Sequence, residues 1–268
     1  MEKLRRWAAK HVYLLLILLP ASLTIVLACI PDEWIWGSLV GILLWSGMLC
    51  VLLRCVTLRD RYLRKALDAM KNGCDPYPLL QETQEQLTYP GPKSGKQIMA
   101  INYALALRER GEYDEAQNLM ESINIDKHAV VPAVKLVYYN NRMDICALTG
   151  RFAEAVIWYE KTAQIFRDLR PGKQKEQLRK AVEANRATWH FCKGEYEQAL
   201  RVLGQAKPEN MNERIENAMM FARTYLAMGE PEKAKKPLRF VAENGNKLYF
   251  ATEAKEFLEK INTEETKL

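Results

Sequence analysis

A six-residue pattern that occurs four times constrains the fold of this chain more than any other feature. In each copy, Gly is followed two positions later by an aromatic residue or Pro and five positions later by Ala. The four glycines are separated by 39, 44 and 35 residues: Gly111, Gly150, Gly194 and Gly229. Each copy lies between two amphipathic stretches of helical periodicity, so Gly ends one helix, the aromatic residue or Pro begins the next, and Ala lets the two approach closely. The sequence therefore predicts repeated helix–turn–helix units, which bury their apolar faces only by stacking.

Two further positions keep the same register relative to the turn glycine. Seven residues before it, the side chain is small in three of four units: Ala104, Met143, Ala187 and Ala222. Nine residues after it, the side chain is always apolar: Met120, Tyr159, Leu203 and Leu238. We therefore expect an all-α fold in which residues 97–262 form an α-solenoid of about four repeats, followed by a tail at 263–268. Within it, a helix at residues 246–261 caps the end of the stack, and residues 62–87 cap its start.

The repeated turn resembles the tetratricopeptide repeat (TPR), a helix–turn–helix unit of about 34 residues. The chain departs from that family in two respects. The spacings of its turns are longer, and Arg142 and Arg186 stand eight residues before the turn glycine, where the family usually has an apolar residue. The resemblance implies a superhelix in which the first helix of each repeat lines a concave groove. Such grooves commonly bind an extended peptide or a helix of a partner protein.

Asparagines recur at one position of the expected groove. Asn102, Asn141 and Asn185 each stand nine residues before their turn glycine, and Met220 replaces them in the fourth repeat. Because Asn is a poor helix former, a ladder of amides that binds a peptide backbone is one interpretation. The other interpretation is that Asn is frequent here in the family and serves the stack itself. Arg223 is the one plausible cation of the groove, so we do not expect the Lys and Arg clamp with which some members bind a terminal carboxylate.

Two apolar runs precede the repeats. Residues 12–30 and 34–53 contain no charged residue and are each just long enough to cross a bilayer. Only Pro31-Asp32-Glu33 separates them, and basic residues flank them within residues 1–11 and within the juxtamembrane helices and linker at 54–96. The pattern predicts a transmembrane hairpin in a cell membrane, with both termini and the repeats cytoplasmic. An alternative is that residues 1–30 are a cleaved signal peptide, because Val26-Leu27-Ala28-Cys29 loosely resembles a lipoprotein cleavage box.

Charge and composition exclude several classes of function. The net charge is +6, but from residue 77 onward 29 Lys and Arg oppose 27 Asp and Glu, so no basic surface for nucleic acid is expected. The three His are far apart, and His190 and Cys192 alone cannot form a zinc site. We expect no catalytic site, no metal and no cofactor.

These observations predict a membrane-anchored TPR interaction protein. Its cytoplasmic groove would scaffold, or assist the assembly of, a membrane-associated protein complex by binding a protein or peptide partner. In the alternative, the hairpin is the working part, as a subunit or chaperone of an integral membrane complex, because Gly37 and Gly41 form a GxxxG spacing in the second run. The identity of the partner and the oligomeric state stay open.

Overall fold

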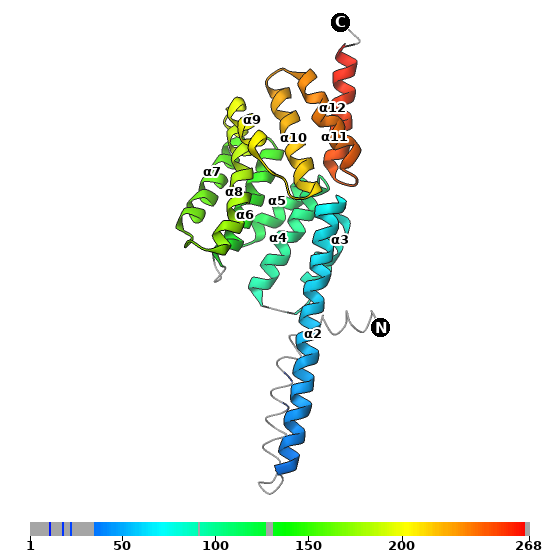
Figure 1. Cartoon of the computed structure of the whole chain (residues 1–268), viewed down its shortest axis with the longest axis vertical. Coiled ribbons are helices and arrows are strands. Elements are labelled where there is room, and N and C mark those ends of the chain that lie inside the picture. The colour runs from blue at the N-terminus through cyan, green and yellow to red at the C-terminus, as the bar shows by residue number, and fades with distance from the viewer. Residues whose placement is uncertain are drawn as a thin grey trace.

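A computed structural model describes residues 35–90, 92–126 and 131–265, together with His11, Leu18 and Ser22. In these residues it contains eleven α-helices, labelled α2 to α12, and no strand. Figure 1 shows α3 to α12 packed side by side in one body, from which the first half of α2 projects. The described chain is therefore all-helical and consistent with a helical solenoid, as the repeats predict.

Each predicted turn joins two helices of the structure. The four pairs are α4 (Lys93–Glu109) with α5 (Tyr113–Ser122), α6 (Pro132–Leu148) with α7 (Phe152–Asp168), α8 (Lys173–Cys192) with α9 (Tyr196–Gln205), and α10 (Met211–Ala227) with α11 (Pro231–Asn244). Helix α2 (Ile35–Gly73) and helix α3 (Tyr77–Leu87) precede the pairs, and α12 (Tyr249–Glu265) follows them. Unequal repeat lengths arise in two ways: α7 has 17 residues against 10 in α5 and α9, whereas α5 and α6 are joined by a longer connection.

All four turns close with the same hydrogen bonds. The turn glycine adopts a φ of +81° at Gly111 and +74° at Gly150, Gly194 and Gly229. The N–H of the next residue then donates to the carbonyl five residues earlier, at 2.8–3.0 Å in every turn. This is the Schellman arrangement, which needs a left-handed residue and so favours Gly. The alanines five positions after the glycines are fully buried, in agreement with the predicted close approach: Ala116, Ala155, Ala199 and Ala234.

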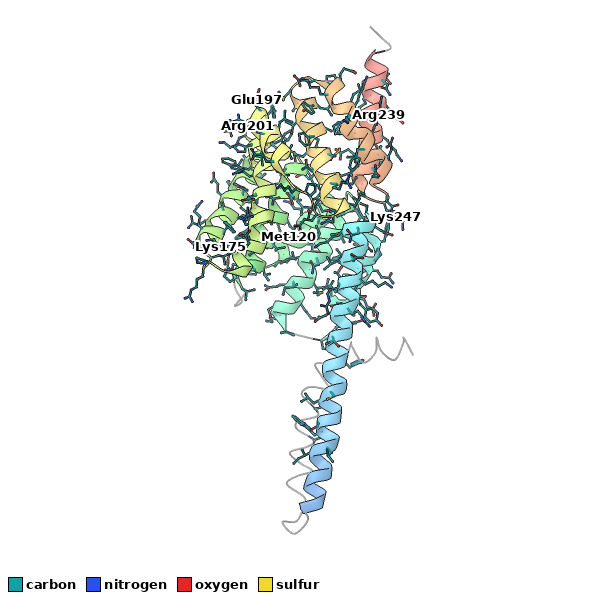
Figure 2. All side chains as sticks on the ribbon, in the orientation of Figure 1. Met120, Lys175, Glu197, Arg201, Arg239 and Lys247 are labelled. Carbon is teal, nitrogen blue, oxygen red and sulfur yellow. The ribbon has the colours of Figure 1, made fainter. Side chains whose placement is uncertain are left out.

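The two ends of the stack contact each other. The connection between α11 and α12 reaches the C-terminal end of α2, where the Lys247 N–H donates to the Cys74 carbonyl at 3.1 Å and the Asn246 amide donates to the Gly73 carbonyl at 2.7 Å. The ammonium of Lys247, which is labelled in Figure 2, also lies 2.6 Å from a carboxylate oxygen of Asp75. Cys74 belongs to the same buried apolar cluster as Leu238 and other residues of α10, α11 and α12. The solenoid is thus closed by contacts between segments about 170 residues apart in sequence.

The first turn takes part in this closure. Tyr249, at the start of α12, packs directly on the turn that joins α4 to α5. A Cβ atom added to Gly111 would lie 2.5 Å from the Tyr249 ring, and Tyr113 meets the same ring edge to face at 5.9 Å between centroids. At this turn, Gly is needed both for its backbone conformation and for the space it leaves.

The predicted membrane hairpin is not found. Residues 12–30 lie outside the described residues apart from Leu18 and Ser22, as do residues 31–34 and, apart from His11, the basic N-terminus at 1–11. From Ile35 onward, the second apolar run is part of α2, a single helix of 39 residues. The second half of α2 is rich in charged residues and packs against α3 and α10.

Among the described residues, no helix combines the length and the apolar content that crossing a membrane requires. The predicted localisation as a two-span membrane protein is therefore wrong. The apolar run shares one helix with the charged residues that follow it, and α2 continues without a break to Gly73.

Candidate functional site

The first helices of the first two repeats carry matching residues along one face. On α6, Val137, Asn141 and Asp144 follow one another at spacings of four and three residues, which places them on one side of the helix. On α4, Ile98 and Asn102 occupy the positions equivalent to Val137 and Asn141. Helices α4 and α6 contact each other, so the two faces are neighbours. We call this surface the α4–α6 face.

Exposed apolar side chains begin the α4–α6 face. Ile98 and Val137 each stand thirteen residues before their turn glycine and are 37% and 40% exposed. The equivalent residue of the fourth repeat is the acid Glu216. The apolar part of this surface is thus confined to α4 and α6 among the residues whose side chains are described.

Buried amides without a partner follow the apolar residues. Asn140 and Asn141 are 8% and 7% exposed, and neither the Asn140 Oδ1 nor the Asn141 Nδ2 has a hydrogen-bond partner among the described residues. On α4, Gln97 donates to the Asn124 carbonyl at 2.9 Å, but its Oε1 is buried without a donor from the described part of the chain. A buried polar atom left unpaired costs about 1–3 kcal/mol, so these amides favour a bound group that offers both donors and acceptors.

A buried cluster of charges follows the amides. The guanidinium of Arg108 on α4 lies 2.6 Å from Asp144 on α6 and 2.6 Å from Glu216 on α10, and it also bonds the neighbouring Glu109. Arg108 and Glu109 are 7% and 3% exposed. One cation therefore joins three helices from three different repeats, and we call these four residues the Arg108 cluster.

The electrostatics of the Arg108 cluster are dominated by burial. Burial raises the pKa of Asp144, and it raises the pKa of Glu216 to about 8, although Arg108 opposes both changes. Burial alone would lower the pKa of Arg108, but Glu109, Glu216 and Asp144 outweigh it and raise that pKa. Three carboxyl groups share one guanidinium, so the cluster holds more acidic groups than it can neutralise.

The structure places the four residues predicted to line the groove on different helices. Asn141 is buried on α6, whereas Asn102 on α4 and Asn185 on α8 are half-buried. Because α6 contacts both α4 and α8, the three asparagines lie on neighbouring helices. Arg223 on α10 is already engaged: one of its terminal nitrogens lies 2.6 Å from both carboxylate oxygens of Glu253 on α12. The amide ladder stays a prediction.

Aromatic residues that could have stacked on a ligand pack on one another instead. Tyr139 stacks on Trp158 with ring centroids 5.5 Å apart. Arg142 lies over the same Trp158 ring at 4.7 Å and pairs with Glu121 at 3.3 Å. This contact explains how an Arg occupies a position that is usually apolar in the family, because a weakly hydrated guanidinium packs well on an indole ring.

The sequence analysis missed Arg108, Glu109, Asp144 and Glu216. One signal could have pointed to Glu216, since an acid stands where the first two repeats carry Ile98 and Val137. No spacing could have shown that it meets Arg108, which is 108 residues away in the chain.

Comparison with known proteins agrees with the repeat. A family described as tetratricopeptide repeat matches residues 100–122, which cover most of α4 and α5. No curated protein and no solved structure gives a significant match. In the described residues, no group of three or more His, Cys, Asp or Glu is placed to hold a metal ion. TPR-type helical folds are typically non-enzymatic and generally mediate binding of protein or peptide partners. The match at the first helix pair, together with four pairs closed by the same turn, supports assignment to the TPR superfamily.

Proposed function

We propose that this chain is a non-catalytic interaction protein that binds a peptide segment of a partner protein on the α4–α6 face. The observation behind the proposal is a pair of buried amide atoms, the Asn140 Oδ1 and the Asn141 Nδ2, which have no partner among the described residues and lie beside exposed apolar side chains. A peptide backbone offers an N–H donor and a carbonyl acceptor at every residue, which is what these amides lack. Ile98 and Val137 would receive an apolar side chain of the same peptide.

Two alternatives fit these residues less well. The aromatic residues on α6, α7 and α8 are already stacked on one another, so they do not offer a free platform for a base or a ring. Arg223 is paired with Glu253, so it is not available to bind a terminal carboxylate. A peptide segment with an apolar side chain fits the amides and the apolar residues together.

Selection from a random peptide library displayed on phage tests the proposal. The full chain is the bait, and the selected peptides are then measured by fluorescence anisotropy against single variants. Val137→Asp and Asn141→Ala should each weaken binding by tenfold or more, because the first places a charge against an apolar side chain and the second removes an amide. Ile157→Asp is the matched control, since Ile157 is also an exposed apolar residue, 52% exposed, but lies on α7.

Two results would overturn the proposal. One is that no peptide is enriched above the level seen with a bait whose Val137 and Asn141 are both substituted. The other is that Ile157→Asp weakens binding as much as Val137→Asp. Circular dichroism spectra that match those of the parent chain show that each variant is folded.

A further inference from the structure

In the Arg108 cluster, only one of the two oxygens of each carboxyl group bonds Arg108. Each of them bonds Arg108 through one oxygen: Glu109 through Oε1, Asp144 through Oδ2 and Glu216 through Oε1. The second oxygen of each has no hydrogen-bond donor among the described residues, and the Glu109 Oε2 is also fully buried. All three guanidinium nitrogens of Arg108 are engaged, so it has little further capacity to satisfy them.

Neighbouring groups do not supply the missing charge. Arg223 is held by Glu253, which leaves that pair neutral. The hydroxyl of Tyr113 is buried without a partner in the described chain, and burial raises its pKa even though Arg223 and Arg108 oppose this. The described surroundings therefore hold an excess of acceptors and no free cation to meet them.

Two side chains of the Arg108 cluster are partly exposed. The side chains of Asp144 and Glu216 are 21% and 36% exposed, whereas Arg108 and Glu109 are buried. Asp144 lies on the same face of α6 as Val137 and Asn141, three residues after the unpaired amide of Asn141. A peptide bound on the α4–α6 face would consequently reach these two carboxyl groups.

We propose that the bound peptide carries a Lys or Arg side chain whose charged group sits against Asp144 and Glu216. This inference rests on the proposed function, because it names the chemistry of the partner at the same face. A cation there would donate hydrogen bonds to the unused oxygens and offset the excess of carboxyl groups. An acidic peptide is disfavoured for the same reason, since it would add negative charge to a cluster that already lacks cations.

The helix geometry sets the spacing within the peptide. Val137 and Asp144 are seven residues apart on α6, which corresponds to roughly 10 Å along the helix axis. An extended peptide advances about 3.3 Å per residue, so the apolar and the basic residue should stand about three positions apart. A bound metal ion is a weaker explanation, because the described residues present no group of three or more metal ligands.

Binding of the cation should be coupled to the release of a proton from Glu216. Glu216 faces Arg108 and Glu109 from α4, Asp144 from α6 and Glu213 from its own helix, and burial is the largest cause that raises its pKa to about 8. A Lys or Arg beside it favours the ionised carboxylate. Binding should therefore release a proton near neutral pH and strengthen as the pH rises through about 8.

The experiment uses peptides selected by the full chain and their analogues in which the basic residue is replaced by norleucine. The variants Asp144→Asn and Glu216→Gln remove charge with little change of shape. Glu197→Gln is the matched control, because Glu197 is an exposed acid on α9, away from α4 and α6 (Figure 2). We expect both cluster variants to weaken binding of the basic peptide tenfold or more, to leave the norleucine analogue within twofold, and the control to change neither.

The outcomes separate the two proposals. If selected peptides depend on Val137 but show no enrichment of Lys or Arg, or if norleucine replaces the basic residue without loss, the cation is refuted and the proposed function stands. If no peptide is selected at all, both are overturned. Calorimetry of the basic peptide in buffers of different ionisation enthalpy gives an independent reading: proton release supports the inference, and its absence with Glu216 intact contradicts it.

Discussion

Replacing Gly111 with Ala tests whether the two ends of the solenoid meet as the structure shows. Every turn glycine has a left-handed φ, so any Ala there is strained by about 1–2 kcal/mol. At Gly150 and Gly194, no described atom outside the adjacent residues lies within 4 Å of an added Cβ, so the backbone strain is the only cost expected there. At Gly111 the new Cβ would lie 2.5–2.9 Å from three atoms of the Tyr249 ring.

The contact with Tyr249 adds a second cost at Gly111. Overpacking a well-filled site typically costs about 1–3 kcal/mol, because the ring or the backbone must move. Gly111→Ala should therefore destabilise the chain by about 2–5 kcal/mol, against about 1–2 kcal/mol for Gly150→Ala or Gly194→Ala. Urea unfolding followed by circular dichroism measures these differences as shifts of the midpoint.

A double-mutant cycle isolates the contact between the ends. In a Tyr249→Ala background the ring is absent, so Gly111→Ala should cost only the strain that Gly150→Ala shows, a coupling of about 1–3 kcal/mol. Equal costs for Gly111→Ala and Gly150→Ala in the parent chain would refute the closed arrangement. So would a cost for Gly111→Ala that is unchanged by removal of the ring. A smaller m-value, which is the slope of the unfolding free energy against urea concentration, would show that the repeats had begun to unfold separately.

Three further predictions follow from burial and charge. Burial raises the pKa of Cys74 to about 11 and that of Cys192 to about 12. At pH 8 a disulfide reagent should therefore label both thiols only after unfolding, whereas the exposed Cys50 should react in the native chain. Peptide mapping by mass spectrometry measures which cysteines are labelled. The raised pKa of Glu216, about 8 against an ordinary 4.5, stabilises the fold fully below pH 4.5 and less as the pH rises through 8. Glu216→Gln should flatten this dependence of the urea midpoint, and an unchanged slope would contradict it. Lys247→Met removes an ion pair with a partly exposed lysine, so it should shift stability by less than about 1 kcal/mol, and a larger shift in thermal unfolding would show that the closing contacts depend on it.

The turns could be predicted because their causes are local. A Schellman turn needs one residue in the left-handed conformation, and the N–H of the next residue donates to the carbonyl five residues earlier. Gly adopts that conformation without any tertiary contact. The buried alanines follow from the same turn, since a helix that reverses on a short turn must pack on its predecessor at once. Four copies of a local rule are visible in sequence without knowledge of the neighbours.

The end of α2 shows why tertiary contacts escape such reasoning. Helix α2 ends at Gly73, but the left-handed residue is Cys74, with a φ of +51°. The carbonyls of Gly73 and Cys74 accept hydrogen bonds from Asn246 and Lys247, so the strained backbone is held by a segment from the far end of the chain. No local pattern identifies that segment.

The predicted membrane span failed for a related reason. Hydropathy reports the apolar content of a run of residues, but it does not report what the helix containing that run packs against. In the structure, residues 35–53 share one helix with a charged stretch that packs on α3 and α10. The composition of the whole helix, rather than that of the apolar run alone, determines what its surface can contact.

The fourth repeat departs from the first two because it forms the closure. On α10, Ile215 and Met219 are buried among residues of α11 and α12, and Arg223 is held by Glu253. Met220 stands where the first repeats have Asn, so this helix has no amide at that position to leave unpaired. Glu216 is the residue of α10 that also reaches α4, through Arg108. If a cation on the α4–α6 face keeps Glu216 ionised, it strengthens the ion pair between α4 and α10, and closure of the solenoid must by linkage favour the bound peptide in return.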